Sequence, residues 1–193
     1  MSRKGYIRTF IAVELPPEIR EAMAGVQAEL KKSGADVGWV RAEGVHLTLK
    51  FLGDVEEGEV VKLCDALSGM LAGEAPFILR AKGIGAFPTP KAPRVVWLGV
   101  EGDTERLSAL AETVERVCAG LKFPRESRPF KSHLTLGRVK SPRGRDALVK
   151  ALESFRDADL GEFKADAVSV MKSELKPFGA VYTEMRRIVL EGK

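Results

Sequence analysis

The two histidines of the chain, His46 and His133, stand in the same local sequence. Each is followed by Leu-Thr-Leu, at residues 46–49 and 133–136, and these two tetrapeptides hold every histidine of the 193 residues. Imidazole has an unperturbed pKa near 6.5, so at neutral pH one ring can be protonated while the other is neutral. Two such side chains can act as a general acid and a general base, a pair that suits phosphodiester cleavage or transfer.

A threonine lies two residues after each histidine. Leu47, Leu49 and their neighbours favour a strand, in which successive side chains point to opposite faces. We therefore expect both leucines to be buried and His46 to share the other face with Thr48. Residues two apart along a strand are separated by roughly 6.6 Å, so an imidazole and a hydroxyl can contact one phosphate group. By the same spacing, Thr48 and Thr135 are candidate ligands of phosphate oxygens.

The basic residues of the chain are concentrated around the second motif. Residues 122–145 hold eight Lys or Arg and one acid, Glu126, a net charge of +7 in a chain whose total is +4. Arg138, five residues after His133, is the candidate guanidinium for balancing phosphate charge. Strict alternation would place Arg138 on the wrong face, but Gly137 could host a bulge or turn that redirects it. Although basic runs are often only solvated faces, this one favours an anionic substrate.

Each of these residues also has a plain structural interpretation. A single strand histidine is more often a satisfied or partly exposed residue than a catalyst, but the repeated setting of both histidines argues against that here. The threonines could simply be good strand formers. Three basic residues near the motifs could be solvated rim charges: Lys50, Arg128 and Lys131. Three aromatic residues could stack on bases, but a core position is the more common one for such residues: Phe51, Phe130 and Tyr182.

Other chemistries fit the sequence less well. No Asp, Glu or Cys stands at ligand spacing beside the histidines, so we do not expect a metal site. Ser132 directly precedes His133, and adjacent strand residues face opposite sides, which argues against a serine nucleophile activated by that histidine. The segment Gly83-Ile84-Gly85 lacks the third glycine and the following helix of a dinucleotide-binding fingerprint.

The flanks of the two motifs repeat as well. Each half reads strand, helix, motif strand, helix, strand, with the helices recognised by their apolar faces. In the first half these elements are expected at residues 9–13, 19–30, 46–49, 60–70 and 77–81. In the second half they are expected at 95–100, 107–121, 133–136, 148–155 and 163–171.

The repeat predicts one domain over residues 1–193, built as an internal duplication. The repeats span about 8–81 and 94–171, and a final strand at about 182–190 is expected to join one of the sheets. Gly83, Gly85 and residues 88–93 are expected to connect the halves. If the halves pack about a pseudo-twofold axis, the two His-Thr faces can confront each other across a cleft.

Composition narrows the class of protein. With 45% hydrophobic and 30% charged residues, the chain is typical of soluble globular proteins, and no apolar run approaches the length of a membrane span. The apolar residues 10–13 end at Glu14, too early for a signal peptide. Cys64 and Cys118 have no CxxC spacing and lie on apolar helix faces, which favours buried free thiols in a reducing cytoplasm. We expect a cytoplasmic protein and, by default, a monomer.

Four longer segments carry a resemblance to a known family. They are His46-Leu-Thr-Leu-Lys-Phe-Leu-Gly53, Gly83-Ile-Gly-Ala-Phe-Pro88, Pro93-Arg-Val-Val-Trp-Leu-Gly99 and Arg128-Pro-Phe-Lys-Ser-His-Leu-Thr-Leu-Gly-Arg138. Together they resemble the bacterial and archaeal RNA 2′,3′-cyclic phosphodiesterases, also called 2′-5′ RNA ligases, of the 2H phosphoesterase superfamily. The resemblance extends from about Arg8 to Leu190, and neither motif departs from the family pattern.

The resemblance implies an α+β fold, a bilobal pseudo-twofold duplication with an antiparallel sheet and helices in each lobe and the active site in the cleft between the lobes. It also implies hydrolysis of RNA 2′,3′-cyclic phosphate ends to 2′-phosphate ends, without a metal or nucleotide cofactor. It implies that His46 protonates the leaving 3′ oxygen and that His133 activates water. It also implies that Thr48 and Thr135 hold phosphate oxygens and that Arg138 is the arginine that follows the second motif. The implied partners are RNAs with such ends, tRNA halves among them.

Two other functions remain open on the sequence. The same histidines could join a cyclic phosphate end to a 5′-hydroxyl, a 2′-5′ ligation of tRNA half-molecules by the reverse chemistry. Alternatively, the chain could be an RNA-binding module that captures phosphate ends without turning them over, because a fold and a motif do not guarantee activity. Product analysis separates the first alternative from hydrolysis, and a bell-shaped dependence of rate on pH would exclude the second.

Overall fold

The computed structural model describes residues 5–176 and 179–192, and the chain alternates between strands and helices along its length. The elements are β1 (Tyr6–Glu14), α1 (Pro17–Lys31), β2 (Val37–Trp39), the 3₁₀ turn η1 (Ala42–Gly44), β3 (His46–Glu56), α2 (Glu57–Leu71), β4 (Phe77–Thr89), β5 (Ala92–Gly102), α3 (Thr104–Gly120), β6 (His133–Val139), α4 (Arg145–Ser154), β7 (Asp159–Ala165), β8 (Ala167–Lys176) and β9 (Gly179–Val189). Each expected helix is present.

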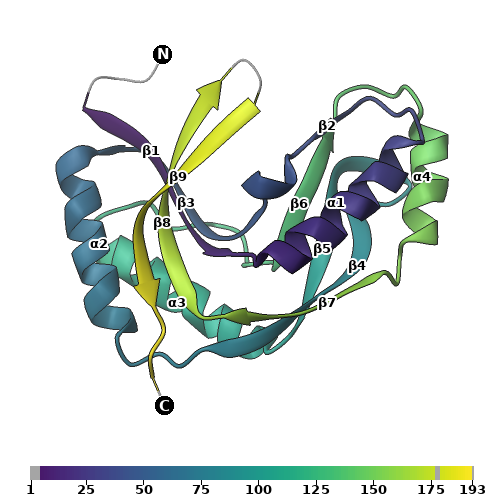
Figure 1. Ribbon diagram of the computed structural model, residues 1–193. Helices are drawn as coiled ribbons and strands as arrows, with labels where there is room; N and C mark the ends of the chain where they lie inside the picture. The colour runs from purple at the N-terminus through teal and green to yellow at the C-terminus, as the bar shows by residue number, and fades with distance from the viewer. Residues whose placement is uncertain (1–4, 177–178, 193) are drawn as a thin grey trace.

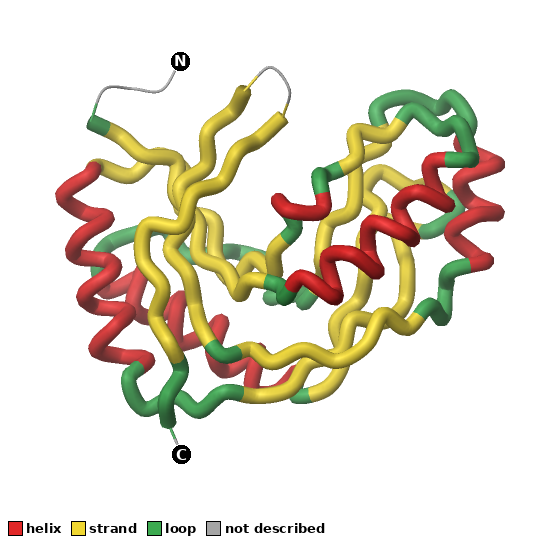
Figure 2. The backbone as a smooth tube through the Cα atoms, in the orientation of Figure 1, coloured by secondary structure: helices red, strands yellow, loops and turns green. Residues whose placement is uncertain are grey.

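Two antiparallel sheets form the framework of the protein. One has the strand order β3-β1-β8-β9 and the other the order β2-β6-β5-β4-β7. Figures 1 and 2 show the sheets in two lobes, with α2 on the side of the four-stranded sheet and α1 and α4 on the side of the five-stranded sheet. The predicted α+β, bilobal fold with an antiparallel sheet in each lobe is therefore confirmed.

The lobes do not coincide with the two halves of the sequence. Helix α1 follows β1 of the four-stranded sheet but packs against β7 and α4, whereas α3 follows β5 of the five-stranded sheet but packs against α2 and β3. Likewise β4, from the first half, pairs with β5, and β8, from the second half, pairs with β1. Each half thus contributes a helix and two strands to the other lobe, and one core joins both lobes.

Each motif ends on a β-bulge at its fourth residue. The pairing of β3 with β1 skips Leu49, and the pairing of β6 with β5 skips Leu136. The expected irregularity beside Gly137 is thus confirmed, and the first motif has an equivalent bulge at Leu49. A bulge changes the face to which the following side chains point, which affects Lys50 in β3 and Arg138 in β6.

The apolar residues of the motifs are buried as expected. Leu47, Leu134 and Leu136 are fully buried and Leu49 nearly so. Cys64 and Cys118 are buried free thiols, again as expected. Among the described residues, no helix is both long enough and apolar enough to cross a membrane.

One expectation about the strands is wrong. Residues 163–171 are not one strand, because β7 pairs with β4 while β8 pairs with β1 in the other sheet. The expected connection between the halves is confirmed in part: the turn at residues 90–91 joins β4 to β5, whereas Gly83 and Gly85 lie within β4. Position 85 of β4 requires a glycine because the indole of Trp97 covers it: a Cβ there would lie 2.3 Å from the ring.

Candidate active site

Side chains from both motif strands line one cavity of about 830 Å³. Thr48 reaches it from β3, and His133, Thr135 and Arg138 reach it from β6. Four of the five site residues expected from the sequence therefore meet in one space, and the bulge at Leu136 explains how Arg138 lies on the same side as His133. The cavity is large enough for more than a phosphate group.

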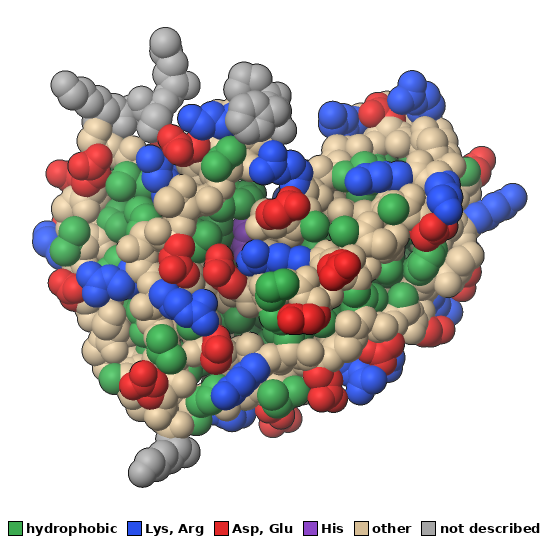
Figure 3. Space-filling model, in the orientation of Figure 1, with side chains coloured by type: hydrophobic (Ala, Val, Ile, Leu, Met, Phe, Trp, Pro, Cys, Tyr) green, Lys and Arg blue, Asp and Glu red, His purple; other side chains and the backbone are tan. Residues whose placement is uncertain are grey.

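His46 lies next to this cavity rather than in its wall. It begins β3 two residues before Thr48, and its ring stacks on Phe10 with 4.3 Å between ring centroids. The ring of Tyr182 lies nearly perpendicular to it, with 5.0 Å between ring centroids. Figure 3 shows a histidine side chain deep in a hollow between the two lobes, with charged side chains around it.

Tyr182 connects the surroundings of His46 with those of Arg138. Burial raises the pKa of the Tyr182 hydroxyl, and the positive charges of Arg8 and Arg138 oppose that rise. Tyr182 belongs to β9 of the four-stranded sheet, and Arg138 belongs to β6 of the five-stranded sheet. The charge of Arg138 in one sheet therefore acts on Tyr182 in the other, and Tyr182 contacts His46.

The two histidines make the same backbone hydrogen bond. His46 Nδ1 lies 2.9 Å from the carbonyl oxygen of Gly44, and His133 Nδ1 lies 2.8 Å from that of Lys131. A carbonyl oxygen can only accept, so Nδ1 carries the hydrogen in each ring. This leaves Nε2 of each ring as the atom that can take up or release a proton. The sequence shows the common position of the rings but does not show this bond.

The pKa of His46 is shifted far from its ordinary value. Burial lowers it from 6.5 to about 4, the hydrogen bond to Gly44 opposes the shift, and the charge of Arg20 lowers it further. His46 is therefore a neutral imidazole at pH 7 in the free protein. As a neutral ring with a hydrogen on Nδ1, it presents a lone pair on Nε2.

His133 borders a second, smaller hollow of about 320 Å³ with an aromatic wall. Its ring lies nearly perpendicular to that of Phe87 with 5.2 Å between centroids, and the centroids of Phe87 and Trp97 are 5.3 Å apart. Lys131 and Phe130 complete the wall and also line the larger cavity. The ring of His133 is thus fixed by an aromatic contact on its side and by the Lys131 carbonyl at Nδ1.

The remaining residues near the motifs fall into different classes. Phe51 is not a core residue, because it is 51% exposed, lines the larger cavity and has the Arg8 guanidinium 4.8 Å above its ring. Arg128 is an exposed charge on the cavity wall. Lys50 is not a solvated rim charge: it is 6% exposed and pairs with Glu115 at 2.7 Å. Its position in a strand pattern could not reveal a partner 65 residues away.

No group of three His, Cys, Asp or Glu side chains is arranged to hold a metal ion among the residues that the structure describes. The expected independence from metals and nucleotide cofactors stays a prediction.

A comparison with protein families gives two consecutive matches along the chain. The model of the family described as "LigT like Phosphoesterase" matches residues 13–97 and again residues 98–182. The chain belongs to this family. The two matches to the LigT-like phosphoesterases each include one of the His-Leu-Thr-Leu motifs.

Individual relatives resemble the chain over nearly its whole length. An RNA 2′,3′-cyclic phosphodiesterase of Methanothermobacter thermautotrophicus is 38% identical over 179 residues, which cover 93% of this chain and 96% of the relative. A crystal structure from Thermus thermophilus matches with a TM-score of 0.80 and 31% identity, covering 97% of this chain and all of that one. Escherichia coli LigT complexed with 3′-AMP matches with a TM-score of 0.76 and 26% identity, covering 96% and 99%.

Proposed function

We propose that this LigT-like phosphoesterase hydrolyses RNA ends that bear a 2′,3′-cyclic phosphate and leaves a 2′-phosphate. The observation that carries the proposal is the meeting of Thr48, His133, Thr135 and Arg138 from both motif strands in one cavity, with His46 two residues before Thr48 in β3. The name of the Methanothermobacter relative, which matches 93% of the chain, supports the same reaction class.

In the proposed reaction, water attacks the phosphorus atom of the cyclic phosphate. Nε2 of His133 accepts the proton of the water, and the bond between phosphorus and the 3′ oxygen breaks. Nε2 of His46 donates a proton to that oxygen, so the phosphate stays on the 2′ oxygen. The hydrogen bonds of Nδ1 to the carbonyls of Gly44 and Lys131 support this arrangement because they leave Nε2 of each ring as the atom that can exchange a proton.

The threonines and the arginine act on the phosphate itself in this proposal. The hydroxyls of Thr48 and Thr135 donate hydrogen bonds to the non-bridging oxygens, one from each motif strand. The Arg138 guanidinium balances the charge that develops on these oxygens as the water adds. Neither step needs a metal ion, so we expect turnover to be insensitive to EDTA.

Because the pKa of His46 is low in the free protein, the ring can act as a general acid only if substrate binding favours its protonated form. A phosphate anion beside the ring favours the imidazolium form, since an opposite charge within a few ångströms raises the pKa of a histidine. We infer that substrate binding and protonation of His46 are coupled. The free protein holds the ring neutral through burial, and the bound phosphate supplies the compensating charge.

Product analysis tests the proposed function. We expect a lone 2′,3′-cyclic nucleotide and an RNA with a cyclic end both to yield a 2′-phosphate in the presence of EDTA. A 3′-phosphate product would contradict the assigned leaving group. Joining of paired tRNA halves without hydrolysis would favour the 2′-5′ ligation of the same ends, and tight binding with no product would favour an RNA-binding module.

A further inference from the structure

Lys50 is a buried lysine directly after the first motif. At 6% exposure it is the one charged residue among the side chains that the described part of the chain buries. It follows the bulged Leu49, so its side chain leaves the face that strict alternation would give it. A buried ammonium group is unfavourable unless it is paired and fully hydrogen-bonded, so its partners matter.

The partners of Lys50 lie far away in the sequence, near the second motif. Its Nζ donates to a carboxylate oxygen of Glu115 in α3 at 2.7 Å and to the carbonyl oxygen of Pro124 at 2.9 Å. The other carboxylate oxygen of Glu115 accepts a hydrogen bond from the backbone N–H of Glu126 at 3.2 Å. One lysine of the first motif strand thus fixes α3 and the segment that follows it.

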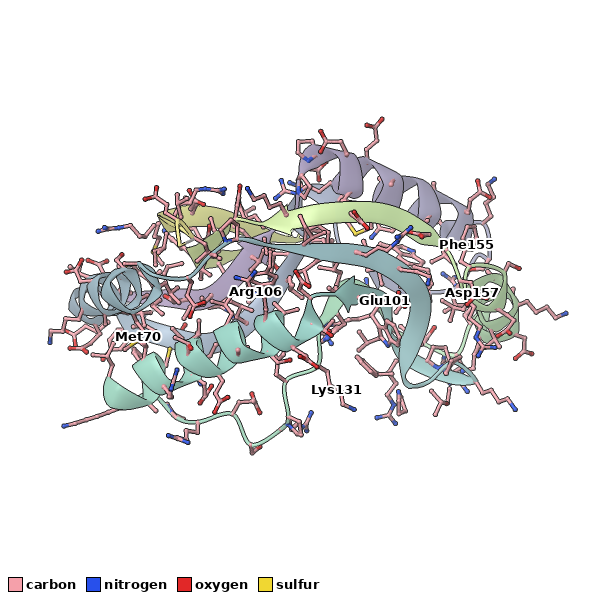
Figure 4. All side chains as sticks on the ribbon, turned by 90° about the horizontal axis from the view of Figure 1, so that it is seen from below. Met70, Glu101, Arg106, Lys131, Phe155 and Asp157 are labelled. Atoms are coloured by element: carbon pink, nitrogen blue, oxygen red, sulfur yellow. The ribbon has the colours of Figure 1, made fainter. Side chains whose placement is uncertain are left out.

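That segment, residues 121–132, leads directly into His133. It contains turns and bends but neither strand nor helix, and it carries Lys131 at its end, as the view from below in Figure 4 shows. The Lys131 carbonyl holds His133 Nδ1, and the Arg128 and Lys131 side chains line the cavity. The position of the segment therefore sets both the tautomer of His133 and the basic wall beside it.

We propose that Lys50, together with Glu115, is a positioning residue that fixes segment 121–132 and thereby orients His133. The first motif strand would then contribute to catalysis twice: through Thr48 in the cavity wall with His46 beside it, and through Lys50, which lines the same cavity and holds segment 121–132. This inference rests on the proposed function, since it assigns Lys50 a role in that reaction. Loosening the segment should affect the chemical step more than binding, because small displacements of a reacting group cost rate.

The test compares Lys50→Met with a matched surface variant, Lys62→Met. Lys62 makes an ion pair of the same 2.7 Å length with Glu59, but exposed on α2. We expect K50M to exchange amide hydrogens faster over residues 121–132 and to lower kcat for a 2′,3′-cyclic nucleotide by about tenfold or more, with KM changed by less than about threefold. K62M should change neither quantity.

A double variant separates positioning from stability. In K50M/E115M no uncompensated carboxylate remains, so the free energy of unfolding should be closer to wild type than in K50M. We expect the segment to stay loose and kcat to stay low, because the contacts to Pro124 and Glu126 are absent.

Unchanged hydrogen exchange over residues 121–132, or a kcat within about twofold of wild type in either Lys50 variant, would overturn the inference. Recovery of kcat along with stability in the double variant would also overturn it. A wild-type protein that shows no turnover would end the proposed function and this inference together, whereas a fully active K50M ends this inference alone.

Discussion

His46 and His133 share a backbone hydrogen bond but have different surroundings. Both rings have Nδ1 fixed by the carbonyl of the residue two positions earlier, which leaves Nε2 for proton transfer. His46 is enclosed by Phe10 and Tyr182, while His133 borders open space. Identical motif residues thereby have different surroundings, and those of His46 lower the pKa of its ring.

The protonation of His46 can be measured directly by NMR titration. In the free protein its ring should titrate near pH 4, because burial disfavours the imidazolium. With 2′-AMP or inorganic phosphate bound, its pKa should rise, because the anion favours the charged ring. A His46 that titrates near pH 6.5 in the free protein, or that does not respond to either anion, would contradict the proposed coupling.

At the scale of the elements, the bulges at Leu49 and Leu136 explain how the motif strands serve the site. In β6 the bulge and Gly137 bring Arg138 to the cavity that His133 lines. Gly137 has no room for a side chain: a Cβ would lie 2.7 Å from Val37 and 3.0 Å from Trp39 in β2. The glycine thus lets β2 close over the strand that carries the second motif.

Gly137→Ala should therefore disturb both packing and catalysis. We expect the free energy of unfolding to fall by about 1–3 kcal/mol, as for other overpacked sites, and kcat to fall because Arg138 is displaced. Gly25→Ala is the matched control, since Gly25 lies in α1 with open space around its Cβ and should gain up to about 1 kcal/mol. Urea unfolding and initial rates measure both effects, and a G137A protein as stable and active as wild type would refute this role of the glycine.

The sequence predicted elements more successfully than their partners. Periodicity located the helices and the motif strands, and the alternation of Leu47 and Leu49 gave the buried face correctly. Periodicity is local, so it could not show that β7 and β8 are separate strands in different sheets. For the same reason the partner of Lys50 was missed, because Glu115 lies on a helix of the other half of the sequence.

At the scale of the whole molecule, helices and strands are exchanged between the two halves of the sequence, so we expect the two lobes to fold as one unit. Because α3 packs against α2 and β3, and α1 against β7 and α4, neither half of the sequence has its full set of packing partners alone. Burial of His46 in this shared structure couples its protonation to the stability of the whole fold.

The stability of the protein should consequently depend on His46 in mildly acidic solution. The folded pKa, about 4, lies below the ordinary value of 6.5, so the unfolded chain binds the proton more tightly. The contribution of His46 is fully present above pH 6.5 and is lost as the pH falls from 6.5 towards 4, about 2 kcal/mol by pH 5. Urea unfolding at pH 7 and pH 5 should show this loss in wild type but not in His46→Gln; equal losses in both would contradict it.

The claim that both imidazoles serve one reaction is tested most directly by the turnover of an RNA with a 2′,3′-cyclic phosphate end in His46→Ala, His133→Ala and the double variant. We expect each single change to lower kcat by at least about 100-fold, because each removes one of two proton transfers of the same step. The double variant should lose little more than the less active single variant, because the two groups act as a unit. Near wild-type turnover in either single variant, with the fold intact, would show that the two rings do not share one reaction.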